Sequence, residues 1–413
     1  MRAEIIAVGT ELLLGQIVGT NEVYLARHLA ALGIDVFFMQ TVGDNPARVQ
    51  DAVRLALSRA DLLLMTGGLG PTEDDLTVAA VGAVLGEELV RNEAVAEEVR
   101  RFFERRGRVP PASVYKQALL PRSARPIPNA RGTAPGVHVE RDGQMIFLMP
   151  GVPHEMEGMM EGYIIPYLRQ QGLQGTTIQS RVLRVTGEGE SAVEERIIDL
   201  LHGAAPTIAP YAKLGEVHLR LTAKGNPTDV AQALDAGEAR VRERLGALVY
   251  GTDEQTLEEV VGALLVARKL TVAVAESCTG GLVAQRLTNV PGSSAYFLGG
   301  VVAYSNDSKA HLVGVAPELL AAHGAVSGPV AEAMAEGIRT VMGSALGVSA
   351  TGIAGPSGGT PEKPVGLVFL GLADGDGGRS VRLMLGPEGG RAGIRHLAAQ
   401  AALNLLRRHV LRQ

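Results

Sequence analysis

A serine at residue 277 lies where an apolar segment meets a pair of glycines. Segment 271–276 predicts a strand, and the run Ser277-Cys278-Thr279-Gly280-Gly281 separates it from a predicted helix. A serine in such a turn projects its hydroxyl from the sheet edge, and the free amides of the following helix can receive an oxyanion. Gly280 and Gly281 would let a substrate approach the backbone. The turn therefore predicts a nucleophilic serine, with an N-cap formed by Ser277 or Thr279 as the structural alternative.

A nucleophilic serine needs a base, and no histidine occurs in residues 219–310. Lys309 is the alternative, because it follows the capping sequence Ser305–Ser308 and so falls in the first turn of a helix. A cation there opposes the helix dipole, which favours the neutral amine that a general base must be. Tyr304 lies five residues earlier and could relay a proton. Together with Ser277, these residues predict acyl transfer without histidine, unless Lys309 is an ordinary solvated cation.

A glycine-rich segment, Thr351–Gly359, follows another predicted strand. Its backbone amides can bind a phosphate or a carboxylate, and its predicted substrate contacts are Thr351, Gly352 and Gly355. Arg391 stands at the start of the last predicted helix, where it is a candidate clamp for a phosphate. A plain surface loop is the alternative for the glycine-rich segment.

The N-terminal part of the chain has a second group of candidate residues. Three glycines and two aspartates follow the apolar strand 61–66: Gly67, Gly68, Gly70, Asp74 and Asp75. The glycine amides can bind phosphate as substrate contacts, and the aspartates can hold a hard divalent cation. Alternatively, the aspartates are only the cap and first turn of the next helix.

A similar strand-to-helix loop lies at residues 149–156. Gly151 offers a further amide to a substrate, and Glu155 offers a carboxylate as a metal ligand or base. The sequence favours neither a functional role nor a helix-capping role for His154. This loop extends the predicted N-terminal substrate and metal site.

The segments that position these residues alternate between strand and helix at both ends of the chain. In the N-terminal part we expect strands at 4–8, 35–41 and 61–66, with helices at 21–32 and 46–60. In the C-terminal part we expect strands at 271–276, 296–305, 346–352 and 366–374, with helices at 257–269, 282–287, 307–315, 328–342 and from about residue 390. In the N-terminal part this order predicts a mostly parallel sheet buried on both faces, with ligands at the carboxyl ends of the strands, and in the C-terminal part the α/β alternation returns.

The middle of the chain has a different order, a strand, a helix, two strands, a helix and a strand (βαββαβ) between residues 176 and 250. It predicts a small KH-like or ferredoxin-like α+β connector. Since the segment lacks a GxxG loop and a basic face, we expect a spacer or dimerisation module rather than an RNA-binding domain. We therefore predict an α/β protein of three domains, at 1–170, 176–250 and 255–413.

Composition limits the classes of function. The chain has 413 residues, of which 46% are hydrophobic and 20% charged, as expected for several packed domains. A net charge of −5 and few aromatic residues argue against direct nucleic-acid binding. The single cysteine, Cys278, excludes an intrachain disulfide framework and predicts a reducing compartment; its expected role is packing. Without a signal peptide or a long apolar run, we expect a cytoplasmic protein that does not bind membranes.

Four ordered segments, AESCTGG, GGVVAYSNDSK, GAVSGPVAEAMA and SATGIAGPSGGTPEKPVG, resemble the C-terminal domain of the CinA family, also found alone as nicotinamide-nucleotide amidase. The resemblance implies hydrolysis of nicotinamide mononucleotide to nicotinate mononucleotide and ammonia, with no cofactor. It also implies catalysis by Ser277 with Lys309 and Tyr304, and substrate contacts from Thr351 and Arg391.

The segments GTELLLGQIVGTN and TGGLGPTEDDLT resemble the molybdopterin-binding fold of the MogA and MoaB type, and RGTAPG and LMPGVPHEM narrow this to the CinA branch. The resemblance implies a nucleotide-diphosphate site with metal-dependent ADP-ribose pyrophosphatase activity. The metal would be Mg²⁺, Mn²⁺ or Co²⁺, with K⁺ as a further cation. We therefore expect an enzyme of pyridine-nucleotide recycling whose partners are small nucleotides and which forms a homodimer.

Two other functions remain open. The N-terminal fold alone favours a molybdenum-cofactor enzyme, which would bind a pterin and not ADP-ribose. A non-catalytic competence or recombination adaptor would act through a protein partner.

Overall fold

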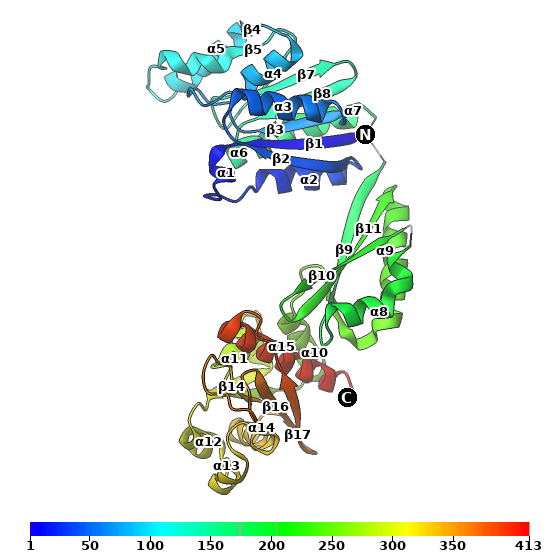
Figure 1. Ribbon diagram of the computed structural model, residues 1–413, viewed down its shortest axis with the longest axis vertical. Coiled ribbons are helices and arrows are strands. Elements are labelled where there is room, and N and C mark those ends of the chain that lie inside the picture. Colours follow the sequence, from blue (N-terminus) through cyan, green and yellow to red (C-terminus); the bar gives the residue numbers. More distant parts are fainter. Residues whose placement is uncertain (173–174, 204, 413) are drawn as a thin grey trace. The chain divides into compact units, whose positions relative to one another are not determined.

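The computed structural model describes residues 1–172, 175–203 and 205–412 (Figure 1). These form two compact units, Met1–Gln179 with Ala223–Gln232, and Ser180–Thr222 with Ala233–Gln413. Residue 413, the end of the predicted third domain, lies outside the described residues. In the described part of the chain, no helix is long and apolar enough to cross a membrane.

The first unit is built on a six-stranded sheet in the order β2-β1-β3-β8-β7-β6. Its strands are β1 (Arg2–Val8), β2 (Asp35–Val42), β3 (Leu62–Thr66), β6 (Arg125–Ile127), β7 (Gly136–Arg141) and β8 (Gln144–Met149). The first four in the order are parallel, and β7 and β6 are antiparallel. Alternate residues of β3 face two different core clusters, Leu63 in one and Leu64 in the other, so the sheet is buried on both faces as predicted.

Helices and a small hairpin complete this unit. The helices are α1 (Thr10–Leu13), α2 (Asn21–Ala31), α3 (Pro46–Leu57), α4 (Thr77–Leu85), α5 (Glu93–Glu104), η1 (Ala112–Ala118), α6 (Pro153–Met159), η2 (Met160–Ile164) and α7 (Ile165–Gln170), and the hairpin pairs β4 (Leu89–Arg91) with β5 (Leu119–Pro121). Helix α3 starts where the sequence indicates, because Pro46 occupies its first turn and the Asn45 side chain accepts a hydrogen bond from the Arg48 amide.

The connector has the predicted βαββαβ order and a four-stranded sheet, β10-β11-β9-β12. Its elements are β9 (Thr177–Val185), α8 (Glu190–Leu201), β10 (Thr207–Lys213), β11 (Glu216–Gly225), α9 (Pro227–Leu245), η3 (Gly246–Leu248) and β12 (Val249–Thr252).

The C-terminal domain has a five-stranded sheet in the order β14-β13-β15-β16-β17. Its elements are α10 (Leu257–Arg268), β13 (Val272–Glu276), α11 (Leu282–Thr288), η4 (Ser293–Ala295), β14 (Phe297–Val302), α12 (Asn306–Val313), α13 (Pro317–His323), α14 (Gly328–Met342), β15 (Leu346–Gly352), β16 (Leu367–Asp374), β17 (Gly377–Met384) and α15 (Gly390–Val410). The first three strands in this order, β14, β13 and β15, are parallel, whereas β15, β16 and β17 pair antiparallel. The carboxyl ends of the three parallel strands meet at one edge, where the predicted residues of this domain gather.

Candidate active site

Ser277 directly follows β13 at the carboxyl edge of the C-terminal sheet. Its amide donates a hydrogen bond to the Ala350 carbonyl of β15 (2.8 Å), and its carbonyl accepts one from the Gly280 amide (3.2 Å). Gly280 and Gly281 have φ values of 61° and 94°, a left-handed backbone that favours glycine. The tight turn thus fixes Ser277, whose residue exposure is 9%.

The amides at the start of helix α11 are not free, because the side chain of Glu276, the last residue of β13, accepts their hydrogen bonds. Its carboxylate is buried and accepts hydrogen bonds from the amides of Gly281 (2.9 Å), Val283 (3.1 Å) and Ala284 (2.8 Å). These amides were expected to be free for an oxyanion, but a buried carboxylate needs donors and takes them. An oxyanion at this turn would have to use the amides of Cys278 or Thr279. The buried glutamate directly before the serine was the signal that sequence reasoning missed.

Cys278 packs into the core of the C-terminal domain, as expected. Burial raises the pKa of its thiol to about 12, so the thiolate is scarce at neutral pH. This environment favours Ser277 over its neighbour as the nucleophile.

Lys309 reaches Ser277 from helix α12. The Ser305 side chain caps this helix by accepting a hydrogen bond from the Ser308 amide (3.0 Å), which places Lys309 in its first turns as predicted. The Lys309 Nζ lies 3.1 Å from Ser277 Oγ. The lysine is only 1% exposed, which excludes the solvated cation, and its burial lowers the pKa of the amine.

Two carbonyl groups determine how the Lys309 amine is oriented. Nζ donates hydrogen bonds to the carbonyl oxygens of Ala303 and Tyr304, each at 3.0 Å. A neutral amine has two hydrogens and one lone pair. When the two carbonyls take the hydrogens, the lone pair is left for the third neighbour, Ser277 Oγ. This geometry suits an amine that accepts the proton of the serine hydroxyl.

The Tyr304 hydroxyl makes no hydrogen bond to Ser277 or Lys309. It accepts a hydrogen bond from Arg391 Nη2 (2.9 Å), and the side chain is 60% exposed. Arg391 Nη1 donates to the Gly355 carbonyl (2.7 Å). Arg391 therefore joins the glycine-rich loop to Tyr304. The predicted proton relay by the Tyr304 hydroxyl has no hydrogen bond to Ser277 or Lys309 to support it.

Arg395 is a second arginine that sequence reasoning missed. It lies four residues after Arg391 on α15 and donates two hydrogen bonds to the Thr279 carbonyl, from Nε (3.2 Å) and Nη2 (2.7 Å). Residues four apart share one face of a helix, so the spacing in GGRAGIRH was the available signal. Helix α15 thus supplies a guanidinium to each of the two glycine turns.

Thr351 and Gly352 have structural partners. The Thr351 hydroxyl donates to the Ala325 carbonyl (2.8 Å), and the residue is 1% exposed. A Cβ on Gly352 would lie 2.7 Å from the Leu367 carbonyl oxygen of β16, so close strand packing requires glycine there. The Thr351 hydroxyl, which was predicted to contact the substrate, therefore already donates its hydrogen within the protein.

In the first unit, the loop after β3, which contains Gly67, lies close to the loop after β8, which contains Gly151. A Cβ on Gly151 would lie 3.4 Å from the Gly67 Cα, and Asn21 links the loops by donating to Thr66 Oγ1 (3.0 Å) and the Gly151 carbonyl (2.9 Å). Asn21 was missed by sequence reasoning, although it begins a helix directly after the GT of GTN. The Asn21 Oδ1 is buried and has no hydrogen-bond partner among the described residues.

Gly67 and Gly68 are also required by packing. A Cβ on Gly67 would lie 2.1 Å from the Val8 carbonyl oxygen, and one on Gly68 would lie 2.3 Å from Thr77 Oγ1. The Gly67 amide, expected to bind phosphate, instead donates to the Met149 carbonyl (3.0 Å).

The acidic residues of this region do not form a complete metal site. Asp75 Oδ2 accepts hydrogen bonds from the Thr72 amide (2.8 Å) and hydroxyl (2.5 Å), and Glu155 accepts one from Asn129 Nδ2 (2.6 Å). Within residues 1–172, 175–203 and 205–412, no group of three His, Cys, Asp or Glu side chains is placed to hold a metal ion. The exposed Asp74 and its neighbour Asp75 fit a cation that takes the rest of its ligands from phosphate oxygens and water.

Comparison with protein-family profiles gives three matches. Residues 4–170 match a probable molybdopterin binding domain, residues 180–251 match the KH domain of damage-inducible protein CinA, and residues 254–410 match the CinA C-terminal domain. The three matches agree with the predicted three-domain layout, and they favour the KH-like alternative for the connector.

Two related proteins match over nine tenths or more of the chain, and a solved structure matches one part of it. A Moorella thermoacetica protein named as a competence-damage inducible protein is 52% identical over 414 residues, which covers 100% of both chains. A CinA-like protein of Dictyoglomus thermophilum is 49% identical over 374 residues, 90% of each chain. A solved structure of the CinA protein of Thermoplasma acidophilum, described as of unknown function, is 32% identical and covers 42% of this chain and 97% of its own, with a TM-score of 0.38.

Proposed function

Because this chain belongs to the CinA family, we propose that its C-terminal domain hydrolyses nicotinamide mononucleotide to nicotinate mononucleotide and ammonia. One observation carries the proposal. The buried Lys309 amine, held by two carbonyls, lies 3.1 Å from the hydroxyl oxygen of Ser277. A serine and a neutral lysine so placed are the minimum set for acyl transfer without histidine or metal.

The first half of the reaction forms an acyl-enzyme. Ser277 Oγ attacks the carboxamide carbon while its proton passes to Lys309 Nζ. The C–N bond then breaks, and the Lys309 ammonium returns this proton to the leaving nitrogen, which departs as ammonia. The substrate is left as an ester of Ser277.

The second half releases nicotinate mononucleotide. Lys309, neutral again, takes a proton from a water molecule that attacks the ester carbon. The bond from that carbon to Ser277 Oγ breaks, and Lys309 returns the proton to the serine oxygen. Arg391, at the glycine-rich loop, would hold the phosphate of the nucleotide through charge-assisted hydrogen bonds.

For the N-terminal domain we propose metal-dependent cleavage of ADP-ribose to AMP and ribose phosphate. The proposal is supported by the two loops that meet at Gly67 and Gly151, and by the adjacent carboxylates of Asp74 and Asp75. A divalent cation held there would neutralise the charge of a bound diphosphate.

Product identification tests both proposals. The purified chain is incubated with nicotinamide mononucleotide, and separately with ADP-ribose and Mg²⁺, Mn²⁺ or Co²⁺. We expect ammonia and nicotinate mononucleotide from the first mixture, and AMP and ribose phosphate from the second. A chain that bound a pterin and cleaved no ADP-ribose would be a molybdenum-cofactor protein instead. A chain inactive on both substrates would favour the adaptor.

A further inference from the structure

Helix α15 links the amidase site to the connector domain. Its first turns carry Arg391 and Arg395, which contact the two glycine turns of the site. Further along the same helix, Gln400 and Arg407 contact the connector. Nine residues separate Arg391 from Gln400, about 14 Å along a helix axis. A helix is stiff over this length, so a contact at one end restrains the other.

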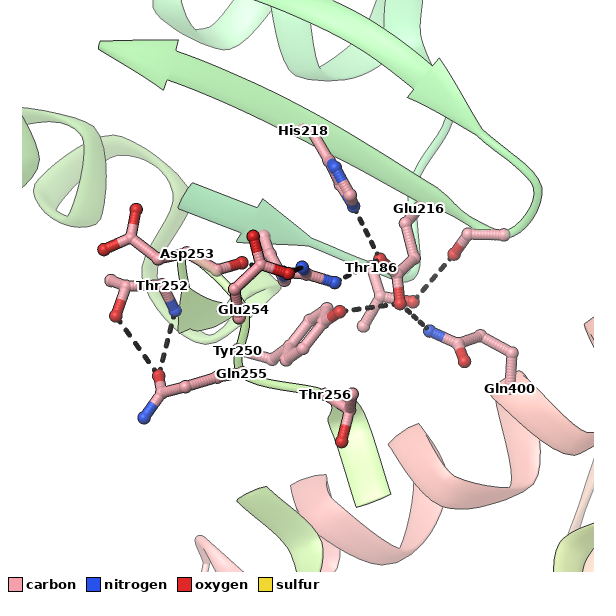
Figure 2. Close-up of polar contacts among 12 residues, drawn as sticks. Thr186, Glu216, His218, Tyr250, Thr252, Asp253, Glu254, Gln255, Thr256 and Gln400 are labelled. Atoms are coloured by element: carbon pink, nitrogen blue, oxygen red, sulfur yellow. Dashed lines mark hydrogen bonds and ion pairs between the residues drawn. The ribbon is translucent and has the colours of Figure 1, made fainter. Parts of the chain in front are cut away.

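Glu216 is the centre of the contact between the connector and α15 (Figure 2). Its Oε1 accepts hydrogen bonds from the Tyr250 hydroxyl (2.6 Å) and from Gln400 Nε2 (2.8 Å). Its Oε2 lies 2.8 Å from His218 Nε2. Glu216, His218 and Tyr250 belong to the connector sheet, and Gln400 alone among these partners belongs to α15. A largely buried carboxylate requires such donors, which makes the geometry specific.

The turn before Glu216 packs tightly on the same helix. A Cβ on Gly215 would lie 3.2 Å from both Gln400 Cγ and Leu397 Cδ2. The Thr186 hydroxyl donates to the Gly215 carbonyl (3.0 Å) and fixes the turn. The turn therefore presents Glu216 to Gln400 at close range.

Arg407 gives α15 a second attachment to the connector. The residue is 3% exposed and donates hydrogen bonds to the Ala247 carbonyl of η3 and to Asn404 Oδ1. Two buried polar contacts, at Gln400 and Arg407, thus hold the helix against the connector.

We infer that the connector is a working part of the amidase, because the Glu216–Gln400 hydrogen bond positions α15 and with it Arg391 and Arg395. Glu216 and Gln400 are positioning residues, since neither contacts Ser277, Lys309 or the glycine-rich loop. The inference rests on the proposed amidase function for its kinetic readout only.

Two nearly isosteric variants of the full chain test it, Glu216→Gln and Gln400→Leu. Gln400→Leu removes the donor of this hydrogen bond, and Glu216→Gln weakens the bond by replacing the charged carboxylate acceptor with a neutral amide. We expect the KM for nicotinamide mononucleotide to rise roughly 3- to 10-fold in both, the usual range for a coupled contact, with kcat within about 2-fold of wild type. The preference for the nucleotide over nicotinamide riboside should fall in parallel, because the helix carries the proposed phosphate clamp.

Glu238→Gln is the matched control. Glu238 accepts hydrogen bonds from Arg181 (2.7 Å) and Arg242 (2.7 Å) within the connector and has no contact with α15. This variant should lower the unfolding temperature and leave KM unchanged. A KM that rises equally in Glu238→Gln, or stays at the wild-type value in both test variants, would overturn the inference.

Amide hydrogen exchange separates this inference from the proposed function. Residues 391–396 should exchange roughly 3- to 10-fold faster in Glu216→Gln and Gln400→Leu than in wild type and Glu238→Gln. If wild type released no ammonia, the amidase proposal would fail while the exchange still tested the positioning. If the wild-type enzyme were active, and both variants kept the wild-type exchange rates and KM, the positioning role would be refuted while the amidase proposal would stand.

Discussion

The Lys309 amine lies 3.1 Å from the Ser277 hydroxyl oxygen, although 32 residues separate them along the chain. The two side chains come from different segments, one at the end of strand β13 and one in helix α12. Their meeting depends on the parallel pairing of β13 and β14, which brings the carboxyl ends of both strands to one edge.

Replacing Lys309 by methionine should lower kcat for deamidation by about 10²- to 10⁴-fold, with KM close to wild type. Methionine keeps most of the side-chain volume and removes only the amine, so the proton acceptor is lost while the fold is retained. Steady-state ammonia release measures both constants.

Lys363→Met is the control for that variant. The Lys363 Nζ also donates to two carbonyls, those of His323 and Val326, each at 2.8 Å, but it does not contact Ser277. Its kcat should stay within a few fold of wild type, since it is not the base. Comparable losses of kcat in the two variants would show that a lysine held by two carbonyls only stabilises the fold here.

The free energy of unfolding should rise with pH in wild type relative to Lys309→Met. Burial lowers the Lys309 pKa below its ordinary value of 10.5. Between the lowered pKa and 10.5 the unfolded chain therefore binds more protons than the folded chain, so folding becomes more favourable as pH rises through that window. Urea unfolding from about pH 6 to about pH 10 measures the difference. A difference that did not change with pH would mean that the amine titrates as in water.

Arg391→Ala should raise the KM for nicotinamide mononucleotide by about 10- to 100-fold and change kcat little, because a charge-assisted contact is lost in both the ground and the transition state. The KM for nicotinamide riboside, which lacks the phosphate, should rise far less. Competition between the two substrates measures this preference.

Tyr304→Phe shows whether the tyrosine hydroxyl acts through Arg391 or in proton transfer. It removes one hydrogen-bond partner of Arg391 and leaves the guanidinium in place. A small rise in KM is expected. A fall in kcat of about 10²-fold or more at unchanged KM would instead support the proton relay.

Asp74→Asn should weaken the metal dependence of ADP-ribose cleavage without affecting deamidation. It removes one carboxylate from a hard-cation site. Asp74 is the better choice than Asp75, because Asp74 is exposed, whereas the half-buried Asp75 carboxylate accepts hydrogen bonds from both the amide and the hydroxyl of Thr72. Identical metal titrations in the variant and wild type would assign Asp74 to the loop only.

The sequence predicts local features of this fold well. The capping sequence at Ser305 places Lys309 in its helix, and the buried strands and glycine turns occur where the patterns indicate. These features depend on neighbours in the chain, and the local pattern therefore encodes them. In the C-terminal domain, strand β17 and the short helix α13 were not predicted. The β17 sequence, GGRSVRLM, is largely polar, and the strand is largely exposed at the edge of the sheet.

Partners that come from distant segments could not be predicted. The two carbonyls that orient Lys309 and the arginine that contacts Thr279 depend on tertiary packing. For the same reason the amides of α11 looked free in the sequence, whereas Glu276 occupies them in the fold. Several glycines predicted to bind substrate are explained by close backbone packing, which has the same sequence signature as a ligand site.

Ammonia release from nicotinamide mononucleotide by Ser277→Ala, measured beside wild type, tests the central claim most directly. The substitution removes one oxygen atom and leaves Lys309, Arg391 and the turn backbone in place. We predict that wild type forms ammonia and nicotinate mononucleotide in equal amounts, and that the variant loses at least about 10³-fold in kcat while its unfolding temperature stays close to wild type. A variant that deamidates the nucleotide at nearly the wild-type rate would show that the Ser277 hydroxyl is not the nucleophile.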